Sequence, residues 1–255
     1  MPKDHCVFSV ANHKFNIIVL AAGVGTRLRP ETDFIPKPLV ELGGQRAIDF
    51  LVRKYQHVAD RMVIATAYCA DLMENYCRGK YPSMTLLFSR EEVSKLAGPG
   101  TSLLYALDCV STRLPTIVTF CDYLLEDQFS IEKDAVCLCN PEVPEAVLDS
   151  YKTVAVVEDG RAIDLNPNAD IARIRKNGFT GVFICHQTMV LKALAYSRAA
   201  ERGADKLDYA TDIVRPYLAR FPTRALPVSR IFEFGTEESL RATRAYIDGT
   251  CRVSR

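Results

Sequence analysis

The stretch IIVLAAGVGTRLRP, residues 17–30, indicates the kind of fold this chain adopts. The apolar run begins at Phe15, is rich in β-branched residues and stops at Leu20, which is typical of a buried strand. Gly23 and Gly25 follow almost at once, and glycines directly after a strand let another group approach the backbone closely. Because ligands of α/β sheets bind beyond the carboxyl ends of the strands, this turn is the first candidate site.

Two familiar glycine loops do not match these letters. A dinucleotide-binding loop needs a third glycine at position 28, which is Leu28. A P-loop needs Gly-Lys-Ser/Thr after four intervening residues, whereas Gly25 is followed by Thr26 and Arg27. The loop is therefore a glycine turn of another type, whose free backbone N–H groups can bind phosphate oxygens.

Two cationic side chains accompany the turn. Arg27 carries a permanent guanidinium that suits phosphate, and Lys37 adds a second positive charge. Pro36 and Pro38 restrict the backbone on both sides of this lysine, so its side chain is presented in a defined direction. With the glycines, these residues predict a polyphosphate site.

The first half of the chain alternates short apolar runs with longer amphipathic segments. Strands are expected at Phe15–Leu20, Arg61–Ala65, Met84–Phe88 and Pro115–Phe120, and helices at Ile48–His57, Asp71–Arg78 and Ser102–Val110. Such alternation implies parallel strands with right-handed crossovers, hence an α/β three-layer sandwich.

After about residue 130 the pattern changes, and turns rich in acidic residues, Gly and Pro separate the apolar runs. Strands are expected at Ala135–Cys139, Thr153–Val157 and Gly181–Cys185, and helices at Thr188–Glu201, Thr211–Ala219 and Glu237–Ile247. No hexapeptide repeat is present, so we expect no β-helix domain. We expect an N-terminal extension over 1–14 and a single domain over 15–255.

Composition excludes some partners and favours one compartment. With 32 basic and 31 acidic residues and a net charge of +1, the chain has no electrostatic reason to bind nucleic acid or a membrane surface. No apolar run is long enough to cross a membrane, and the N-terminus lacks the apolar core of a signal peptide. The cysteines are odd in number, nine, and several lie in apolar runs, which indicates free thiols and a cytoplasmic protein.

The segment LAAGVGTRLRPETDFIPKPLVELGGQRAIDF, residues 20–50, resembles the signature region of the sugar nucleotidyltransferases. The resemblance implies a Rossmann-like nucleotidyltransferase fold, glycosyltransferase-A-like, with a mostly parallel mixed sheet. It implies that Arg27 and Lys37 contact phosphates as the catalytic cations. The backbone that holds the nucleoside triphosphate would be Leu20, Ala21, Ala22, Gly23, Gly25 and Thr26.

Further segments extend the resemblance over about residues 15–248. SREEVSKLAGPGTSLLYALD resembles the second nucleotide-contacting region, which implies roles for Gly100 and Thr101. TIVTFCDYLL and IFEFGTEESLRA resemble the two segments that bind the metal, which implies Mg²⁺ held by Asp122 and Glu233. FTGVFI resembles the strand that faces the acceptor, which implies Thr180 and Gly181. The family implies a nucleotide-binding half at about 15–130, an acceptor-binding half at about 131–250, and the capacity to form a homo-oligomer.

The chain departs from the family pattern at the metal and at the acceptor. The second metal position is usually aspartate and is Glu233 here, so Asp208 and Asp212 remain alternatives. Cys121 replaces the usual glycine before the first metal aspartate, which we interpret as a packing change. The usual acceptor lysine is missing from DLNPNADIARIRK, where basic residues could substitute for it: Arg173, Arg175 and Lys176.

The resemblance implies transfer of a nucleoside monophosphate from an NTP to a phosphorylated small molecule, with release of pyrophosphate. A sugar 1-phosphate is the expected acceptor, for synthesis of activated sugars such as those of cell-surface polysaccharides. Relatives that transfer CMP to phosphocholine or a phosphonate offer an alternative. A cationic acceptor would need acidic or aromatic side chains, for which Asp208, Tyr123, Tyr209 and Phe232 are available. A non-catalytic regulatory protein that binds nucleotide-sugar is the third hypothesis, which the presence of Arg27, Lys37 and Asp122 disfavours.

Overall fold

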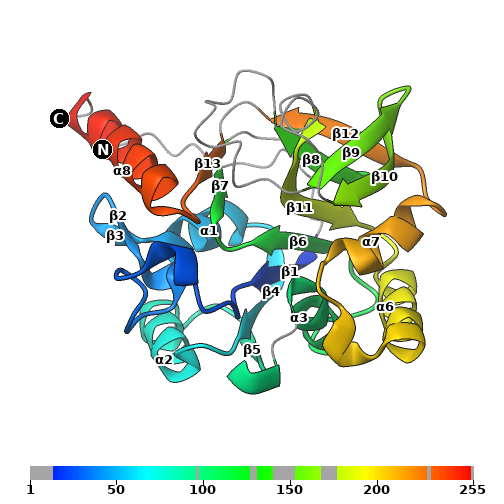
Figure 1. Ribbon diagram of the computed structural model, residues 1–255, viewed down its shortest axis with the longest axis horizontal. Coiled ribbons are helices and arrows are strands. Elements are labelled where there is room, and N and C mark those ends of the chain that lie inside the picture. The colour runs from blue at the N-terminus through cyan, green and yellow to red at the C-terminus, as the bar shows by residue number, and fades with distance from the viewer. Residues whose placement is uncertain are drawn as a thin grey trace.

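In the computed structural model of this chain, a mixed sheet lies between two layers of helices (Figure 1). The structure describes residues 14–95, 98–126, 131–139, 153–167, 177–228 and 231–253, with side chains as far as 249. Within these ranges nine strands form one sheet in the order β5-β4-β1-β6-β11-β8-β12-β10-β9. The strands are β1 Phe15–Leu20, β4 Ala59–Thr66, β5 Leu86–Arg90, β6 Thr116–Phe120, β8 Ala135–Cys139, β9 Thr153–Glu158, β10 Arg161–Pro167, β11 Phe179–Cys185 and β12 Thr223–Val228.

The first four strands of this order run parallel, so their carboxyl ends meet at one edge of the sheet. β1 pairs in parallel with β4 and with β6, and β4 pairs in parallel with β5. β11 is antiparallel to both of its neighbours, while β12 returns parallel to β8. The glycine loop after β1 and Asp122 after β6 therefore leave the sheet at neighbouring points of the same edge.

Helices cover both faces of the sheet because alternate residues of its central strands are apolar on each side. Ile17 and Val19 of β1 pack with α1 and α2 in one core cluster, whereas Ile18 and Leu20 pack with α3, α6 and α7 in the other. The helices are α1 Ala47–Tyr55, α2 Ala70–Lys80, α3 Pro99–Ala106, α6 Thr188–Arg202, α7 Thr211–Leu218 and α8 Glu237–Val253. The expected α/β three-layer architecture is confirmed.

Two small sheets and several short helical turns complete the described fold. β2 Glu41–Leu42 pairs with β3 Gln45–Arg46, and β7 Tyr123–Leu125 pairs with β13 Ile231–Glu233. The 3-10 helices are η1 Thr26–Leu28, η2 Lys37–Leu39, η3 Val93–Lys95 and η4 Ala204–Lys206. Over the residues described, no helix is both long and apolar enough to cross a membrane.

Most predicted elements agree with the structure to within a few residues, and α3 differs for a clear reason. It spans Pro99–Ala106 rather than 102–110, because Pro99, with its fixed φ, starts the helix early. The patterns missed β10 and β12, as well as the very short β2, β3, β7 and β13. The predicted extension 1–14 lies outside the described residues except for Lys14.

Candidate active site

The loop after β1 is closed on itself by its own polar groups. Gly25 adopts the left-handed conformation, with φ 71°, which favours glycine, and its carbonyl oxygen accepts from the Leu28 N–H at 2.9 Å. The Thr32 hydroxyl donates to the same carbonyl at 2.8 Å. Gly23 is exposed, and a Cβ there would have no heavy atom within 4 Å. No protein atom therefore demands a glycine at position 23, and open space faces the backbone there.

Tyr68, which the sequence patterns did not single out, holds both ends of this loop. Its N–H donates to the Ala22 carbonyl at 3.4 Å, and its hydroxyl reaches the carbonyls of Thr32 at 2.9 Å and Asp33 at 2.6 Å. The residue follows β4, so its place beside the loop depends on the pairing of β1 with β4. No local motif marks such a contact in the sequence.

The remaining predicted backbone positions lie at the start of the loop. Leu20, Ala21 and Ala22 are buried, and the Leu20 side chain belongs to the core beneath α3. Only their backbone can therefore face a ligand. Thr26 is exposed on η1. Nucleotide binding by these residues stays a prediction.

Lys37 reaches across the site to Asp122. The lysine begins η2, its Nζ lies 2.8 Å from Asp122 Oδ2, and the two side chains are 14% and 13% exposed. Burial disfavours the ammonium, but the charge of Asp122 and its hydrogen bond outweigh burial and raise the pKa of Lys37. The lysine is therefore a fully charged cation held at the end of β6.

Glu233 arrives at the same place through the pairing of β13 with β7. Glu233 lies opposite Tyr123 in this ladder, and the Phe234 N–H donates to the Asp122 carbonyl at 3.2 Å. On the other side, the Thr243 hydroxyl of α8 donates to the Glu233 carbonyl at 2.9 Å. A three-residue strand and the start of α8 thus bring Glu233 beside Asp122.

Gly235 marks the point where the charged groups converge. A Cβ on this glycine would lie 2.2 Å from Glu233 Oε1, 3.2 Å from Asp122 Oδ2 and 3.3 Å from Arg27 Nη2. Arg27 is an exposed residue, and its guanidinium Nη2 lies beside this group. The structure therefore brings together all four residues predicted as catalytic cations and metal ligands.

The carboxylate of Glu233 has an unused oxygen. Its side chain is fully buried, and Oε1 accepts from the Gly235 N–H at 2.6 Å. Oε2 has no hydrogen-bond partner among the described residues, and the nearby Ser239 hydroxyl lies 3.0 Å from the Thr236 carbonyl. Burial, and then the neighbouring Asp122 charge, raise the pKa of Glu233. A buried carboxylate oxygen without a partner is costly, so this site favours an added cation.

These two carboxylates fit a magnesium ion. Mg²⁺ prefers oxygen ligands, and in phosphate-transfer sites it takes only one or two carboxylates from the protein and the rest from water and phosphates. Within the described ranges, no group of three or more His, Cys, Asp or Glu side chains could hold a metal. Asp122 and Glu233 thus match a metal that is shared with a substrate. The ion itself stays a prediction.

The two other acidic candidates lie elsewhere. Asp212 pairs with Arg202 at 2.6 Å and accepts from the Tyr209 N–H at 3.2 Å, so its oxygens are already used. Asp208 is exposed, and its carbonyl packs against Gly98 at the start of α3. In the described part of the chain no contact joins either residue to Asp122, so Glu233 is the better second ligand.

Gly100 and Thr101 have a packing role that the sequence did not predict. A Cβ on Gly100 would lie 2.5 Å from the Tyr209 carbonyl and 2.6 Å from the Leu207 carbonyl. Thr101 is 2% exposed, and its hydroxyl donates to the Ala204 carbonyl at 2.7 Å. Both residues join α3 to the segment before α7, and their contact with a nucleotide stays a prediction.

The predicted acceptor residues are only partly described. Thr180 is fully buried, and its hydroxyl donates to the Cys137 carbonyl at 2.9 Å, so its side chain has no surface to offer an acceptor. A Cβ on Gly181 would lie 2.4 Å from the Phe120 ring, which places this ring directly over β11. The basic residues of 173–176, Arg173, Arg175 and Lys176, lie outside the described residues.

The aromatic side chains near the site divide into two groups. Phe120 and Tyr123 flank Asp122 in sequence and meet edge to face, with ring centroids 6.4 Å apart. Phe232 instead stacks on Tyr246 at 4.2 Å, on the opposite face of β13 from Glu233. Tyr209 is exposed before α7. Cys121 is buried, which raises the pKa of its thiol to about 12 and agrees with a packing role.

A glycine loop after the first strand, with two cations and two carboxylates beyond it, defines an α/β nucleotidyltransferase-type fold. The chain matches the family model of the MobA-like NTP transferase domain over residues 17–208 and belongs to this family. It is 30% identical to N-acetylmuramate alpha-1-phosphate uridylyltransferase of Caulobacter vibrioides, over 66% of this chain and 74% of that protein. It is 29% identical to 2-aminoethylphosphonate cytidylyltransferase of Lancefieldella rimae, over 48% of this chain and 49% of that protein.

A solved structure gives the same fold over almost the whole chain. CTP:phosphocholine cytidylyltransferase of Streptococcus pneumoniae superposes with a TM-score of 0.73 at 19% identity, covering 92% of this chain and 99% of that one. The first curated relatives are longer, and the chain spans about half of their length. The resemblance to the sugar nucleotidyltransferases and the mixed α/β fold expected from it are thus confirmed, and the particular substrates are left open.

Proposed function

We propose that this protein transfers a nucleoside monophosphate from an NTP to a phosphorylated small molecule, most simply a sugar 1-phosphate, and releases pyrophosphate. The observation that carries the proposal is the convergence of Arg27, Asp122 and Glu233 around Gly235, with Lys37 bound to Asp122, beyond the carboxyl ends of β1 and β6. The similarity to the Caulobacter uridylyltransferase supports a sugar phosphate as the acceptor.

The proposed reaction requires the protein to neutralise the charge of the phosphates and to align the acceptor with the NTP. A phosphate monoester is already an anionic nucleophile, so attack on the α-phosphorus of the NTP needs no general base from the chain. The acceptor phosphate and the NTP are both anions and repel each other. Arg27 and Lys37 offset this repulsion by placing fixed positive charge beside the phosphates. The loop at Gly23 and Gly25 can add backbone N–H groups. Pyrophosphate leaves opposite the incoming oxygen.

Asp122 and Glu233 would hold Mg²⁺, which would offset the negative charge of the phosphates. The Lys37 ammonium forms an ion pair with Asp122, while Glu233 keeps one oxygen without a partner among the described residues. Binding of metal and triphosphate would let Lys37 exchange its carboxylate partner for a phosphate.

The test is pyrophosphate release from each common NTP against a panel of sugar 1-phosphates, phosphocholine and 2-aminoethylphosphonate, with Mg²⁺ present. We expect turnover with one NTP and one acceptor class, and loss of turnover in Asp122→Asn. If every pair stays inert while nucleotide still binds, the proposal fails and a binding protein for nucleotides or nucleotide-sugars becomes the better explanation.

A cytidylyltransferase acting on phosphocholine or a phosphonate is the second candidate. It is supported by the similarity to the Lancefieldella cytidylyltransferase and by the Phe120–Tyr123 aromatic pair beside Asp122. The face of an aromatic ring attracts a quaternary or primary ammonium group. Among the same assays, activity confined to CTP and a cationic acceptor would select this candidate over the sugar phosphate.

A further inference from the structure

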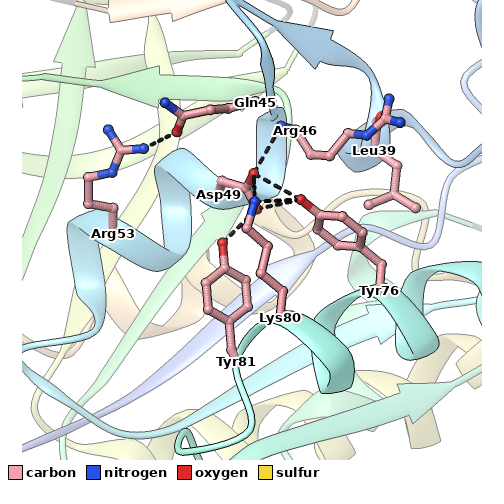
Figure 2. A network of polar contacts seen from close by, with 8 residues as sticks. All are labelled: Leu39, Gln45, Arg46, Asp49, Arg53, Tyr76, Lys80 and Tyr81. Carbon is pink, nitrogen blue, oxygen red and sulfur yellow. Dashed lines mark hydrogen bonds and ion pairs between the residues drawn. The ribbon is translucent and has the colours of Figure 1, made fainter.

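Asp49, in the first turn of α1, is the centre of a polar cluster behind the site (Figure 2). The residue is 3% exposed, yet its carboxylate accepts from Tyr76 at 2.9 Å, Lys80 at 2.6 Å and Tyr81 at 2.5 Å, all on α2 or directly after it. Burial disfavours the charged carboxylate, but these donors together lower the pKa of Asp49 below its ordinary value. A charged, fully satisfied Asp49 therefore locks α1 against α2.

Arg46 connects this cluster to the segment that carries Lys37. Its backbone N–H donates to Asp49 Oδ2 at 3.0 Å, and its guanidinium Nη1 donates to the Leu39 carbonyl at 2.9 Å. Figure 2 shows the Arg46 side chain extending from the Asp49 cluster toward Leu39. Next to it, the Ala47 N–H donates to the Val40 carbonyl at 3.0 Å. The start of α1 is thus bonded twice to the end of η2.

The short path from Leu39 to Lys37 is stiff. Pro36 and Pro38 fix their own φ angles, the Leu39 N–H donates to the Pro36 carbonyl at 2.8 Å, and the Val40 N–H donates to the Lys37 carbonyl at 3.1 Å. A displacement of Leu39 therefore moves the Lys37 backbone with it, because the turn cannot bend to absorb the change. The Lys37 ammonium would then leave the place it holds, 2.8 Å from Asp122.

We propose that Arg46 and Asp49 are positioning residues for Lys37. The inference rests on the proposed role of Lys37 toward the phosphates. Arg46 acts on the Leu39 carbonyl, and Asp49 acts by holding Arg46 and the start of α1. A misplacement of about 1 Å at a reacting centre can cost about 100-fold in rate, so a small shift of η2 is enough to matter.

A double-mutant cycle between Arg46→Met and Lys37→Met separates positioning from general stabilisation. In the wild-type background we expect R46M to lower kcat/KM by roughly 10-fold, within the range for misplaced catalytic groups. In the K37M background the same change should lower it by less than about 2-fold, since the group that Arg46 positions is gone. Equal losses in both backgrounds would overturn the proposal.

Arg53→Met is the matched control. Arg53 lies on the same helix and donates to the Gln45 side chain, but within the described part of the chain no hydrogen bond or ion pair joins it to η2. R53M should leave kcat/KM unchanged. Asp49→Asn is the second test variant. When kcat/KM is corrected for the fraction of folded protein, D49N should lower it by about as much as R46M does. If Asp49 were only a structural residue, D49N would lower the melting temperature and leave kcat/KM of the folded protein unchanged. That result would also contradict the inference.

One measurement does not depend on turnover. The ¹⁵N resonance of the Lys37 ammonium, recorded in protein with labelled lysine and assigned by its absence in K37M, reports the contact with Asp122. We expect it to shift in R46M and in D49N and to stay in place in R53M. An unchanged resonance in R46M would overturn the positioning role even in an active enzyme. If the wild type is inactive toward every NTP, the proposed function fails, while the resonance still decides whether Arg46 places Lys37.

Discussion

Lys37 and Asp122 stand 85 residues apart in the sequence and form a nearly buried ion pair of 2.8 Å at the carboxyl edge of the sheet. The lysine comes from a proline-bounded turn and the aspartate from the end of β6, so the pair joins the two segments that handle phosphate and metal in the proposed reaction. Its position has consequences for both partners.

Lys37→Met should weaken catalysis and strengthen cation binding. Loss of one charged contact to a transition state costs about 10²- to 10³-fold in kcat. The Lys37 ammonium also repels a cation and occupies Asp122 Oδ2. Without nucleotide, K37M should therefore bind Mn²⁺ several-fold more tightly than the wild type in electron paramagnetic resonance titrations. Unchanged or weaker Mn²⁺ binding without nucleotide would contradict the exchange of partners proposed for Lys37.

Asp122→Asn should lower turnover by about 10²-fold or more, while nucleotide binding measured by calorimetry falls much less. The amide keeps the size of the side chain but cannot neutralise a cation. Asp71→Asn is the control, since Asp71 is 79% exposed and pairs with Arg90 on the surface. A full rate in D122N would remove Asp122 from the metal site.

Glu233→Gln tests the electrostatics of the buried carboxylate. The folded-state pKa of Glu233 is raised, so its ionised form opposes folding. This penalty builds up as pH rises from the unfolded-state pKa of about 4.3 to the raised folded-state pKa, and it stays constant above that. Without divalent cations, E233Q should therefore be more stable than the wild type at about pH 7.5, by about 1 to 3 kcal/mol, the usual cost of an unsatisfied buried polar group. Below about pH 4 the side chain at position 233 is largely neutral in the wild type as well as in E233Q. The difference in stability between the two proteins should then vanish in urea unfolding curves.

Added Mg²⁺ with nucleotide should reverse that order, because the wild type gains from binding a ligand that the variant holds poorly. An E233Q protein that is less stable than the wild type at neutral pH without metal would show that Glu233 is a structural hydrogen-bonding residue.

Gly235→Ala should damage the site without straining the backbone. The added methyl group would lie 2.2 Å from Glu233 Oε1 and close to Asp122 and Arg27, so the carboxylates must move apart. We expect kcat to fall by at least about 10-fold. Gly79→Ala is the control, because Gly79 lies in α2 with open space around it. It should keep full activity and raise the free energy of unfolding by about 0.5 to 1 kcal/mol. Full activity in G235A would mean that the four charged groups need not stay together.

Tyr68→Phe removes only the hydroxyl that holds Thr32 and Asp33. The glycine loop should become looser, which we expect to raise KM for the NTP by about 3- to 10-fold, the range for loss of one hydrogen bond. Tyr196→Phe is a matched control. Tyr196 lies on α6, and its hydroxyl donates to Asp108, which is not part of the site. Equal KM values for Y68F and the wild type would argue against a role for Tyr68 in the loop.

The sequence predicted those features that depend on neighbouring residues. Apolar periodicity located β1 and the strands beside it, because buried strands and amphipathic helices leave distinct local patterns. Gly25 and Pro36-Lys37-Pro38 marked the two turns that are proposed to bind phosphate, since backbone conformation there is set by the residues themselves. Asp122 could be placed because it follows a recognisable buried strand.

The pairing of Asp122 with Lys37 and Glu233, in contrast, was decided by the tertiary structure. β7 and β13 have three residues each, too few for any periodicity, and only their ladder brings Glu233 to Asp122. Gly100 looked like part of a ligand loop, yet it is packed against the backbone of 207–209, a contact between segments more than a hundred residues apart. Tyr68, Arg46 and Asp49 act through such contacts too. Local sequence therefore determined which charged groups and turns are available for the proposed phosphate and metal sites, because each depends only on its neighbouring residues, and long-range packing determined which of them meet.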